Sequence, residues 1–299
     1  LHLVAPNLRM GIGVILIDMN QVTISNIFMQ MRFGGDKSLD EGLTRHMVLN
    51  GLRSYKRKFG EKYGEMVICS DDRHYWRKEI FPYYKQGRKS SQETSSIDWQ
   101  ELYRILNLLK EEIREYMPWK MIQVEHAEAD DVIATLCHEF GIEFGGGERI
   151  LILSSDKDFK QLQKFSNVDQ YSPIQKKWIK ENNPVRYLKE HIMEGDKGDG
   201  IPNFLSDDNC LVGDGIKKTL GQKKIGGWIN QAPEDFCTES MLRGWRRNEA
   251  LIDLSLVPGT VSVEVMRQYN AELPKRGDLF EYFMKNKLKN LMSDIGEFQ

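Results

Sequence analysis

The first 183 residues alternate short apolar runs with segments whose apolar residues recur at helical spacing. The run at 13–18 is rich in β-branched residues and ends in a carboxylate, and Ile24, Ile27, Phe28 and Met31 follow it. This order predicts a strand followed by a helix. Further strands are predicted at 66–71, 121–124 and 150–155, and further helices at 40–63, 98–116 and 128–140.

Strands that alternate with helices predict an α/β fold with a mostly parallel sheet covered by helices on both faces. After about Pro184 the strand signals fade, and Gly-rich turns and helices replace them. We therefore predict an N-terminal α/β domain over 1–183 and a smaller C-terminal helical region over 184–299.

One segment of the predicted α/β domain has a different composition. Residues 73–89 are dense in Arg, Lys and aromatic side chains, and residues 90–96 are polar with little apolar surface. Such a stretch cannot bury enough apolar surface to order itself. The composition predicts a flexible loop over about 73–97.

Composition excludes several classes of protein. No apolar run approaches the roughly 18 residues of a membrane helix. The four cysteines lie far apart and form no C-x-x-C pair, which argues against a zinc ribbon, a thioredoxin motif or a disulfide-rich secreted scaffold. Residues 1–9 carry no basic region followed by an apolar one, so no signal peptide is expected. A reducing cytoplasm is the predicted location.

Carboxylates follow three of the predicted strands. Asp18, Asp71 and Asp156 stand at strand ends, and a parallel sheet brings such positions to one edge. Six more acids lie in nearby motifs: Glu128, Asp130, Asp131, Asp158, Asp196 and Asp199. Nine carboxylates in one cleft would resist ionisation without cations.

Mg²⁺ prefers hard oxygen ligands, and two such ions about 3.5–4 Å apart can activate a water and stabilise the leaving oxygen of a phosphodiester. The predicted chemistry is hydrolysis of a nucleic-acid backbone. The alternative is that these acids cap the helices that follow them. The net charge of −2 becomes +7 when the nine acids are set aside, as a phosphate-binding surface requires.

The motifs at these positions resemble the 5′-nuclease (flap endonuclease) family. Their order and spacing match over roughly 12–202, and they comprise Asp18, Asp71 and the segments 84–88, 128–131, 155–158 and 195–202. The resemblance implies a PIN-like fold whose helical region contains a helix–turn–helix-like DNA-binding element. Two departures stand out: Gly200 replaces the family's Asn, and ten residues separate Pro202 from Gly213.

The resemblance implies a 5′→3′ exonuclease and flap endonuclease with ribonuclease H activity, which removes RNA primers in lagging-strand DNA replication. It implies two Mg²⁺ ions, for which Mn²⁺ substitutes. Asp18, Asp71, Glu128, Asp130 and Asp156 would serve the first ion, Asp158, Asp196 and Asp199 the second, and Asp131 an outer shell.

The resemblance also implies contacts with the substrate. The predicted loop over about 73–97 would form an arch, and Lys85 and Arg88 would touch the scissile phosphate from its base. Tyr84 would stack on the terminal base, and Arg77 would bind nucleic acid. The expected partners are DNA and RNA–DNA duplexes with 5′ ends, flaps or forks, a single-stranded-DNA-binding protein and a sliding clamp, with no membrane. The chain is expected to be monomeric and, for a phage-encoded enzyme, to work in the host cytoplasm.

Several basic segments of the sequence allow two interpretations. Lys217, Lys218, Lys223 and Lys224 flank glycines, which suits phosphate contact, although a run of charge is often a solvated face. The basic side chains at 53–62 have the same two interpretations. His74, His126 and His191 have no partners at metal-ligand spacing and are expected to be structural.

Two other classes of function remain as alternatives. A PIN-type endoribonuclease shares strand-end acids, but it lacks a basic arch and usually ends near half this length. A non-catalytic nucleic-acid-binding protein could keep the fold with a decayed site, whereas all nine acids are in place here.

Overall fold

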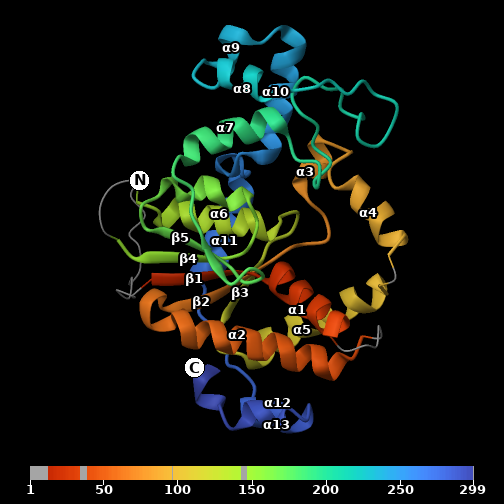
Figure 1. The fold of residues 1–299 in the computed structure, drawn as a ribbon. Helices are drawn as coiled ribbons and strands as arrows, with labels where there is room; N and C mark the ends of the chain where they lie inside the picture. The colour runs from red at the N-terminus through yellow and green to blue at the C-terminus, as the bar shows by residue number, and fades with distance from the viewer. Residues whose placement is uncertain (1–12, 34–38, 96, 143–146, 299) are drawn as a thin grey trace.

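A six-stranded sheet forms the centre of the computed structural model, which describes residues 13–33, 39–95, 97–142 and 147–298 (Figure 1). The strand order is β3-β2-β1-β4-β5-β6, and every neighbouring pair is parallel except β5 and β6. The strands are β1 (Gly13–Asp18), β2 (Glu65–Ser70), β3 (Lys120–Gln123), β4 (Arg149–Leu153), β5 (Val168–Ser172) and β6 (Lys177–Ile179).

Helices connect the strands and make up most of the chain after β6. The α-helices are α1 (Met19–Phe33), α2 (Glu41–Tyr63), α3 (Trp76–Ile80), α4 (Gln86–Glu93), α5 (Trp99–Tyr116), α6 (Ala129–Phe140), α7 (Pro184–Glu194), α8 (Gln222–Trp228), α9 (Pro233–Phe236), α10 (Glu239–Ile252), α11 (Gly259–Asn270), α12 (Leu279–Lys285) and α13 (Lys289–Met292). The 3₁₀ helices of the described residues are η1 (Asp158–Lys164), η2 (Leu254–Leu256) and η3 (Ile295–Phe298). None of the helices in the described ranges has the length and apolar character of a membrane span.

Each face of the sheet has its own apolar core, because successive side chains of a strand point to opposite faces. Ile15 and Ile17 of β1 pack with α2 and α5 on one face, whereas Val14 and Leu16 pack with α6 and α11 on the other. The end of the chain completes the first core, where Phe298 stacks on Trp119 with ring centroids 5.7 Å apart. The last helices, α12 and α13, therefore lie beside α2 and α5, at the end of the molecule opposite α8, α9 and α10 (Figure 1).

The four predicted strands and the helices between them are confirmed. The predicted series did not include β5 and β6, which end the sheet. Residues Asp169 and Gln170 interrupt the apolar pattern of β5, and β6 has only three residues. Neither strand carries the continuous apolar run that identifies a buried parallel strand.

The prediction of a loop over 73–97 is wrong for local structure, because helices α3 and α4 lie within it. Contacts with distant segments hold this part of the chain. The backbone N–H of Lys85 donates to the Asp199 carbonyl at 2.7 Å, and the Arg88 guanidinium pairs with the Asp199 carboxylate. Composition indicates only whether a segment can fold by itself. It gives no information on the contacts with other segments that order this part of the chain.

The helix–turn–helix-like element is not confirmed. Residues 195–221, all of them described, separate α7 from α8 with turns and one isolated bridge between Asp196 and Ile201. This segment is rich in glycine and contains a proline, which disfavour a helix interior. The helical region instead packs α7, α8 and α10 around Phe204 and Trp245.

The turn between α2 and β2 depends on a glycine. Gly64 has φ +80°, and a Cβ there would lie 2.4 Å from the carbonyl oxygen of Gly13. We expect Gly64→Ala to lower the free energy of unfolding by about 1–3 kcal/mol. Gly226→Ala is the matched control, because α8 leaves open space around that position, and it should raise stability by up to about 1 kcal/mol. Urea unfolding of both variants measures the difference, and equal effects would contradict this account of the turn.

Candidate active site

Three strand-end aspartates define the site. Because β2, β1 and β4 are neighbours in the sheet, Asp71, Asp18 and Asp156 come to one edge. Ser154 Oγ donates to Asp18 Oδ2 at 3.1 Å, and the backbone N–H of Ala129 donates to Asp71 Oδ1 at 2.6 Å. The second contact fixes the start of α6, and with it Asp130, beside the strand ends.

These carboxyl groups resist ionisation together. Burial and the nearby Asp71 charge raise the pKa of Asp18 to about 7. Burial and the Asp158 charge raise the pKa of Asp156 to about 6. Burial also raises the pKa values of Asp71 and Asp130, and the Asp156 charge adds to the effect on Asp130. Oxygen donors that repel one another in this way form a set that suits divalent cations.

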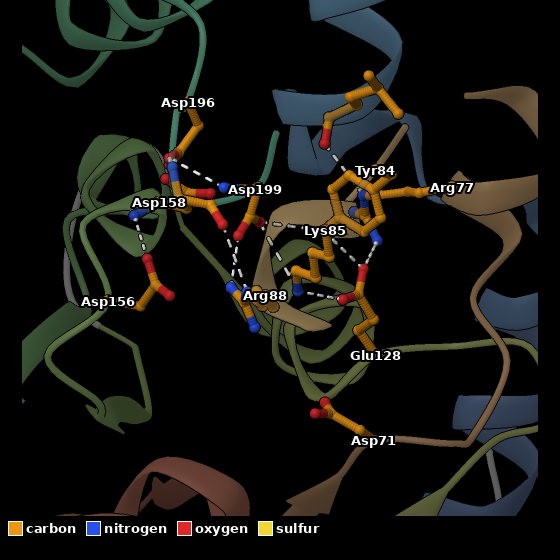
Figure 2. A network of polar contacts seen from close by, with 12 residues as sticks. Asp71, Arg77, Tyr84, Lys85, Arg88, Glu128, Asp156, Asp158, Asp196 and Asp199 are labelled. Atoms are coloured by element: carbon orange, nitrogen blue, oxygen red, sulfur yellow. Dashed lines mark hydrogen bonds and ion pairs between the residues drawn. The ribbon is translucent and has the colours of Figure 1, made fainter. Parts of the chain in front are cut away.

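Basic groups neutralise a second set of acids close by. Glu128 pairs with Lys85 and with Arg77, whose Nη1 lies 2.9 Å from Glu128 Oε2. Asp199 pairs with Arg88 and lies 3.7 Å from Lys85 Nζ (Figure 2). Burial opposes the ionisation of Glu128 and Asp199, yet the Lys85 charge holds the pKa values of both below their usual range.

Tyr84 and Arg77 require corrections. Tyr84 is 2% exposed, and its hydroxyl lies 3.0 Å from Glu128 and 3.2 Å from Asp199, so its ring offers no face for a terminal base. Arg77 is also 2% exposed and donates from Nε to the Leu251 carbonyl at 3.0 Å. Arg77 therefore holds acids in place and does not reach nucleic acid.

Asp131 serves the start of α6. Its Oδ2 accepts the Glu128 backbone N–H at 2.9 Å and the Trp76 Nε1–H at 3.1 Å, and its Oδ1 lies 2.8 Å from Arg77. The carboxylate is fully buried. This is the helix-capping arrangement, and it orients Glu128 and Asp130.

A third group contains a histidine. His191 Nε2 lies 2.8 Å from Asp158 Oδ1 and 3.8 Å from Asp196 Oδ2, and Lys157 Nζ pairs with Asp196 at 2.9 Å. His191, for which the sequence showed no partner at metal-ligand spacing, thus lies beside two carboxylates. Spacing gave no signal, because 33 residues separate His191 from Asp158.

The loop that carries Asp196 and Asp199 packs against the segment that carries Lys85. Gly200 has φ +75°, and a Cβ there would lie 2.7 Å from the Tyr83 carbonyl oxygen. Lys85 itself has φ 55°, an uncommon value outside glycine. Gly200, the departure noted in the sequence, therefore occupies a left-handed position that glycine adopts readily.

The candidate phosphate contacts differ in position. Lys217, Lys218, Lys223 and Lys224 are all exposed. Lys217 and Lys218 line a hollow of about 610 Å³ together with Lys157 and Asp196. The basic surface therefore adjoins the carboxylates.

Two arginines of α2 are engaged in ion pairs. Arg53 pairs with Asp294, and Arg57 Nη1 lies 3.6 Å from Glu297. Both acids come from the end of the chain that covers α2. These contacts favour a structural role for the two arginines over binding of a duplex.

Comparison with known proteins gives matches over the whole described fold. Residues 14–194 match the family of 5′-3′ exonuclease N-terminal resolvase-like domains, and residues 186–298 match the T4 RNase H C-terminal family. Ribonuclease H of Enterobacteria phage T4 is 32% identical over 298 residues, which cover 96% of each chain. Flap endonuclease Xni of Shewanella sp. strain MR-4 is 30% identical over 150 residues, 46% of this chain and 51% of that protein.

Solved structures of bacteriophage T5 proteins share the fold. The T5 flap endonuclease, in a complex with DNA and metal ions, superimposes with a TM-score of 0.59 at 14% identity. The alignment covers 96% of this chain and 98% of that chain. The T5 5′-exonuclease with bound zinc gives a TM-score of 0.56 at 15% identity, again over 96% and 98% of the two chains.

The raised pKa values predict how stability depends on pH without divalent cations. Between the ordinary Asp value of 3.8 and about pH 7, the folded chain keeps protons on Asp18 and Asp156 that the unfolded chain has released. The free energy of unfolding should therefore fall as pH rises through this window, and between pH 5 and pH 8 the fall should be about 2–4 kcal/mol. Urea unfolding in EDTA at pH 5 and pH 8 measures it.

Two controls isolate the cause of that dependence. Asp18→Asn removes one of the raised groups, so its stability should change less between pH 5 and pH 8. Added Mg²⁺ should restore stability at pH 8. Equal or greater stability of the wild-type chain at pH 8 in EDTA would refute the assignment of repulsion to this edge.

Proposed function

Since the chain belongs to the 5′-3′ exonuclease family and is a 5′→3′ nuclease, we propose that it hydrolyses RNA–DNA and DNA–DNA duplexes at 5′ ends and flaps with two Mg²⁺ ions. Removal of RNA primers during lagging-strand replication is the proposed role. The single observation that supports the chemistry best is the set of mutually repelling carboxyls at the ends of β1, β2 and β4.

The described residues offer two sets of ligands. Asp18, Asp71, Glu128, Asp130 and Asp156 would hold the first ion, and Asp158, Asp196 and Asp199 the second. When bound, such ions would activate a water and stabilise charge on the leaving oxygen. Mn²⁺ should substitute, since it accepts carboxylate and water ligands as well.

Lys85 and Arg88 are the proposed contacts with the scissile phosphate. Lys85 Nζ lies between Glu128 and Asp199, and Arg88, whose side chain is more exposed, pairs with Asp199 (Figure 2). Their charges stand where negative charge would develop on a phosphoryl oxygen. Glu128 stays in place because Arg77 and Tyr84 also hold it.

Within the predicted helical region over 184–299, the part formed by α7, α8 and α10 is the proposed grip on the duplex. The acidic segment at 203–212 is compatible with this role, because Asp208 pairs with Arg247 and with Arg243, the latter at 2.9 Å. The backbone N–H of Ile216 donates to Asp207 at 2.9 Å. The acids are thus engaged within the protein, while the lysines at 217–224 face solvent.

The two alternative functions are less well supported. A PIN-type endoribonuclease does not explain the match of residues 186–298 to the T4 RNase H C-terminal family. A non-catalytic binding protein does not require carboxyl groups packed at a cost in ionisation. Cleavage of a 5′-flap DNA in Mg²⁺, compared with a single-stranded RNA, separates the three functions.

Loss of a proposed ligand should affect cleavage and leave binding intact. We expect Asp130→Asn or Asp156→Asn to lower the single-turnover cleavage of a 5′-flap in Mg²⁺ by about 10³-fold. The Kd for the same DNA in Ca²⁺ should change by less than about 3-fold. Asp40→Asn is the control, since Asp40 caps the distant helix α2 and Asn caps equally well. Near wild-type cleavage by either variant would contradict the ligand assignment.

The two sets of basic residues should act on different steps. Lys85→Ala should lower the single-turnover rate by about 10²-fold with little change in Kd. Replacing the lysines at 217, 218, 223 and 224 with Gln should weaken binding and reduce its salt dependence.

A charge-matched control removes four exposed lysines in or next to α12 and α13, which lie at the end of the molecule opposite α8 (Figure 1), namely Lys275, Lys285, Lys287 and Lys289. Replacing these with Gln should leave the salt dependence unchanged. If Lys85→Ala weakened binding and left single-turnover cleavage intact, its assignment to the phosphate would be wrong.

A further inference from the structure

His191 faces the carboxylates from an element that the proposed ligand set does not use. It lies near the end of α7 and is 4% exposed. One ligand atom from each of Asp158, His191 and Asp196 can be chosen so that all three lie within 4.8 Å of one another. Within the described ranges, no other group of three His, Cys, Asp or Glu side chains brings its ligand atoms this close together.

The spacing of the three donors is that of ligands around one ion. Adjacent ligands of an octahedral cation with bonds of 2.0–2.2 Å are about 3 Å apart. His191 Nε2 lies 2.8 Å from Asp158 Oδ1 and 3.8 Å from Asp196 Oδ2. A buried imidazole between two carboxylates is therefore placed either to donate a hydrogen bond to Asp158 or to share a cation with both acids.

Charge and access favour the cation. Two carboxylates meet here, and Lys157, whose side chain is half exposed, pairs with Asp196 from the solvent side. Asp196 and Lys157 also line the hollow that opens toward Lys217 and Lys218. An ion could therefore enter from solvent and replace the lysine as the partner of Asp196.

We propose that His191 is a ligand of the second cation through Nε2, and that this mixed nitrogen and oxygen site, although it accepts Mg²⁺, binds a transition-metal ion such as Mn²⁺ more tightly. Imidazole nitrogen binds Mn²⁺, whereas Mg²⁺ takes oxygen ligands almost exclusively. The inference rests on the proposed two-metal function and adds a residue that sets the identity of one ion.

The test distinguishes a ligand from a hydrogen-bond donor. His191→Gln places an N–H donor near the position of Nε2, so it preserves a hydrogen bond to Asp158 and removes the imidazole. Pulsed electron paramagnetic resonance of the whole chain with one and two equivalents of Mn²⁺ detects nitrogen bound to the ion. The wild-type chain should show a histidine nitrogen coupling that His191→Gln lacks. His126→Gln, whose parent imidazole pairs with Glu79 at 3.0 Å, should retain it.

Calorimetric titration gives a second readout. His191→Gln should lose about 10-fold or more in Mn²⁺ affinity and less than about 3-fold in Mg²⁺ affinity. If the variant fails to fold, wild-type chain labelled with ¹⁵N-histidine shows whether a histidine nitrogen binds the ion, because the coupling then changes from ¹⁴N to ¹⁵N. Among the described residues, His191 is the histidine that lies in such a group of ligands.

The outcomes separate this inference from the proposed function. Mn²⁺ binding without nitrogen coupling would overturn the role of His191 as a ligand and leave the nuclease proposal standing. Absence of any Mn²⁺ or Mg²⁺ binding at millimolar concentrations would overturn both.

Discussion

Repulsion among carboxylates at the end of β1, β2 and β4 is the constraint on which the rest of this molecule depends. Asp18, Asp71 and Asp156 are brought together by the parallel sheet itself, so their proximity is inherent in the topology. Their raised pKa values show the cost of holding them there without cations. That cost is typical of a functional site and has no benefit for folding.

Basic side chains of the protein neutralise the second set of acids, which lies close to the strand ends. Arg77, Lys85 and Arg88 converge on Glu128 and Asp199, and Tyr84 donates into the same cluster (Figure 2). These contacts connect three separate segments, namely the residues after β2, the start of α6 and the loop after α7. Because Phe81 and Tyr84 belong to the apolar core of the helical region, the arch segment is anchored at its base. Lys85, the proposed contact with the scissile phosphate, is thus held by the same contacts that join the two parts of the chain.

The end of the chain contributes stability away from the site. Tyr282, Phe283, Leu291 and Phe298 enter the core beneath β1, α2 and α5, and α11 packs on α6. The acids near Phe298 also engage basic side chains of α2. The exposed lysines near α8 and the carboxylates lie apart from these contacts, and they remain the proposed surface for nucleic acid.

The sequence by itself determined the alternation of strands and helices and the position of the strand-end aspartates, because periodicity is local and a parallel sheet brings strand ends to one edge. Tertiary structure alone decided what surrounds those acids. Three features depend on contacts between segments that are 33 to 174 residues apart. They are the burial of Arg77 and Tyr84, the helices of the arch, and the contact of His191 with Asp158. Side-chain type shows that tyrosine can stack and that arginine can bind phosphate. Whether a ring or a guanidinium meets solvent or a buried carboxylate depends on packing, which no local pattern encodes.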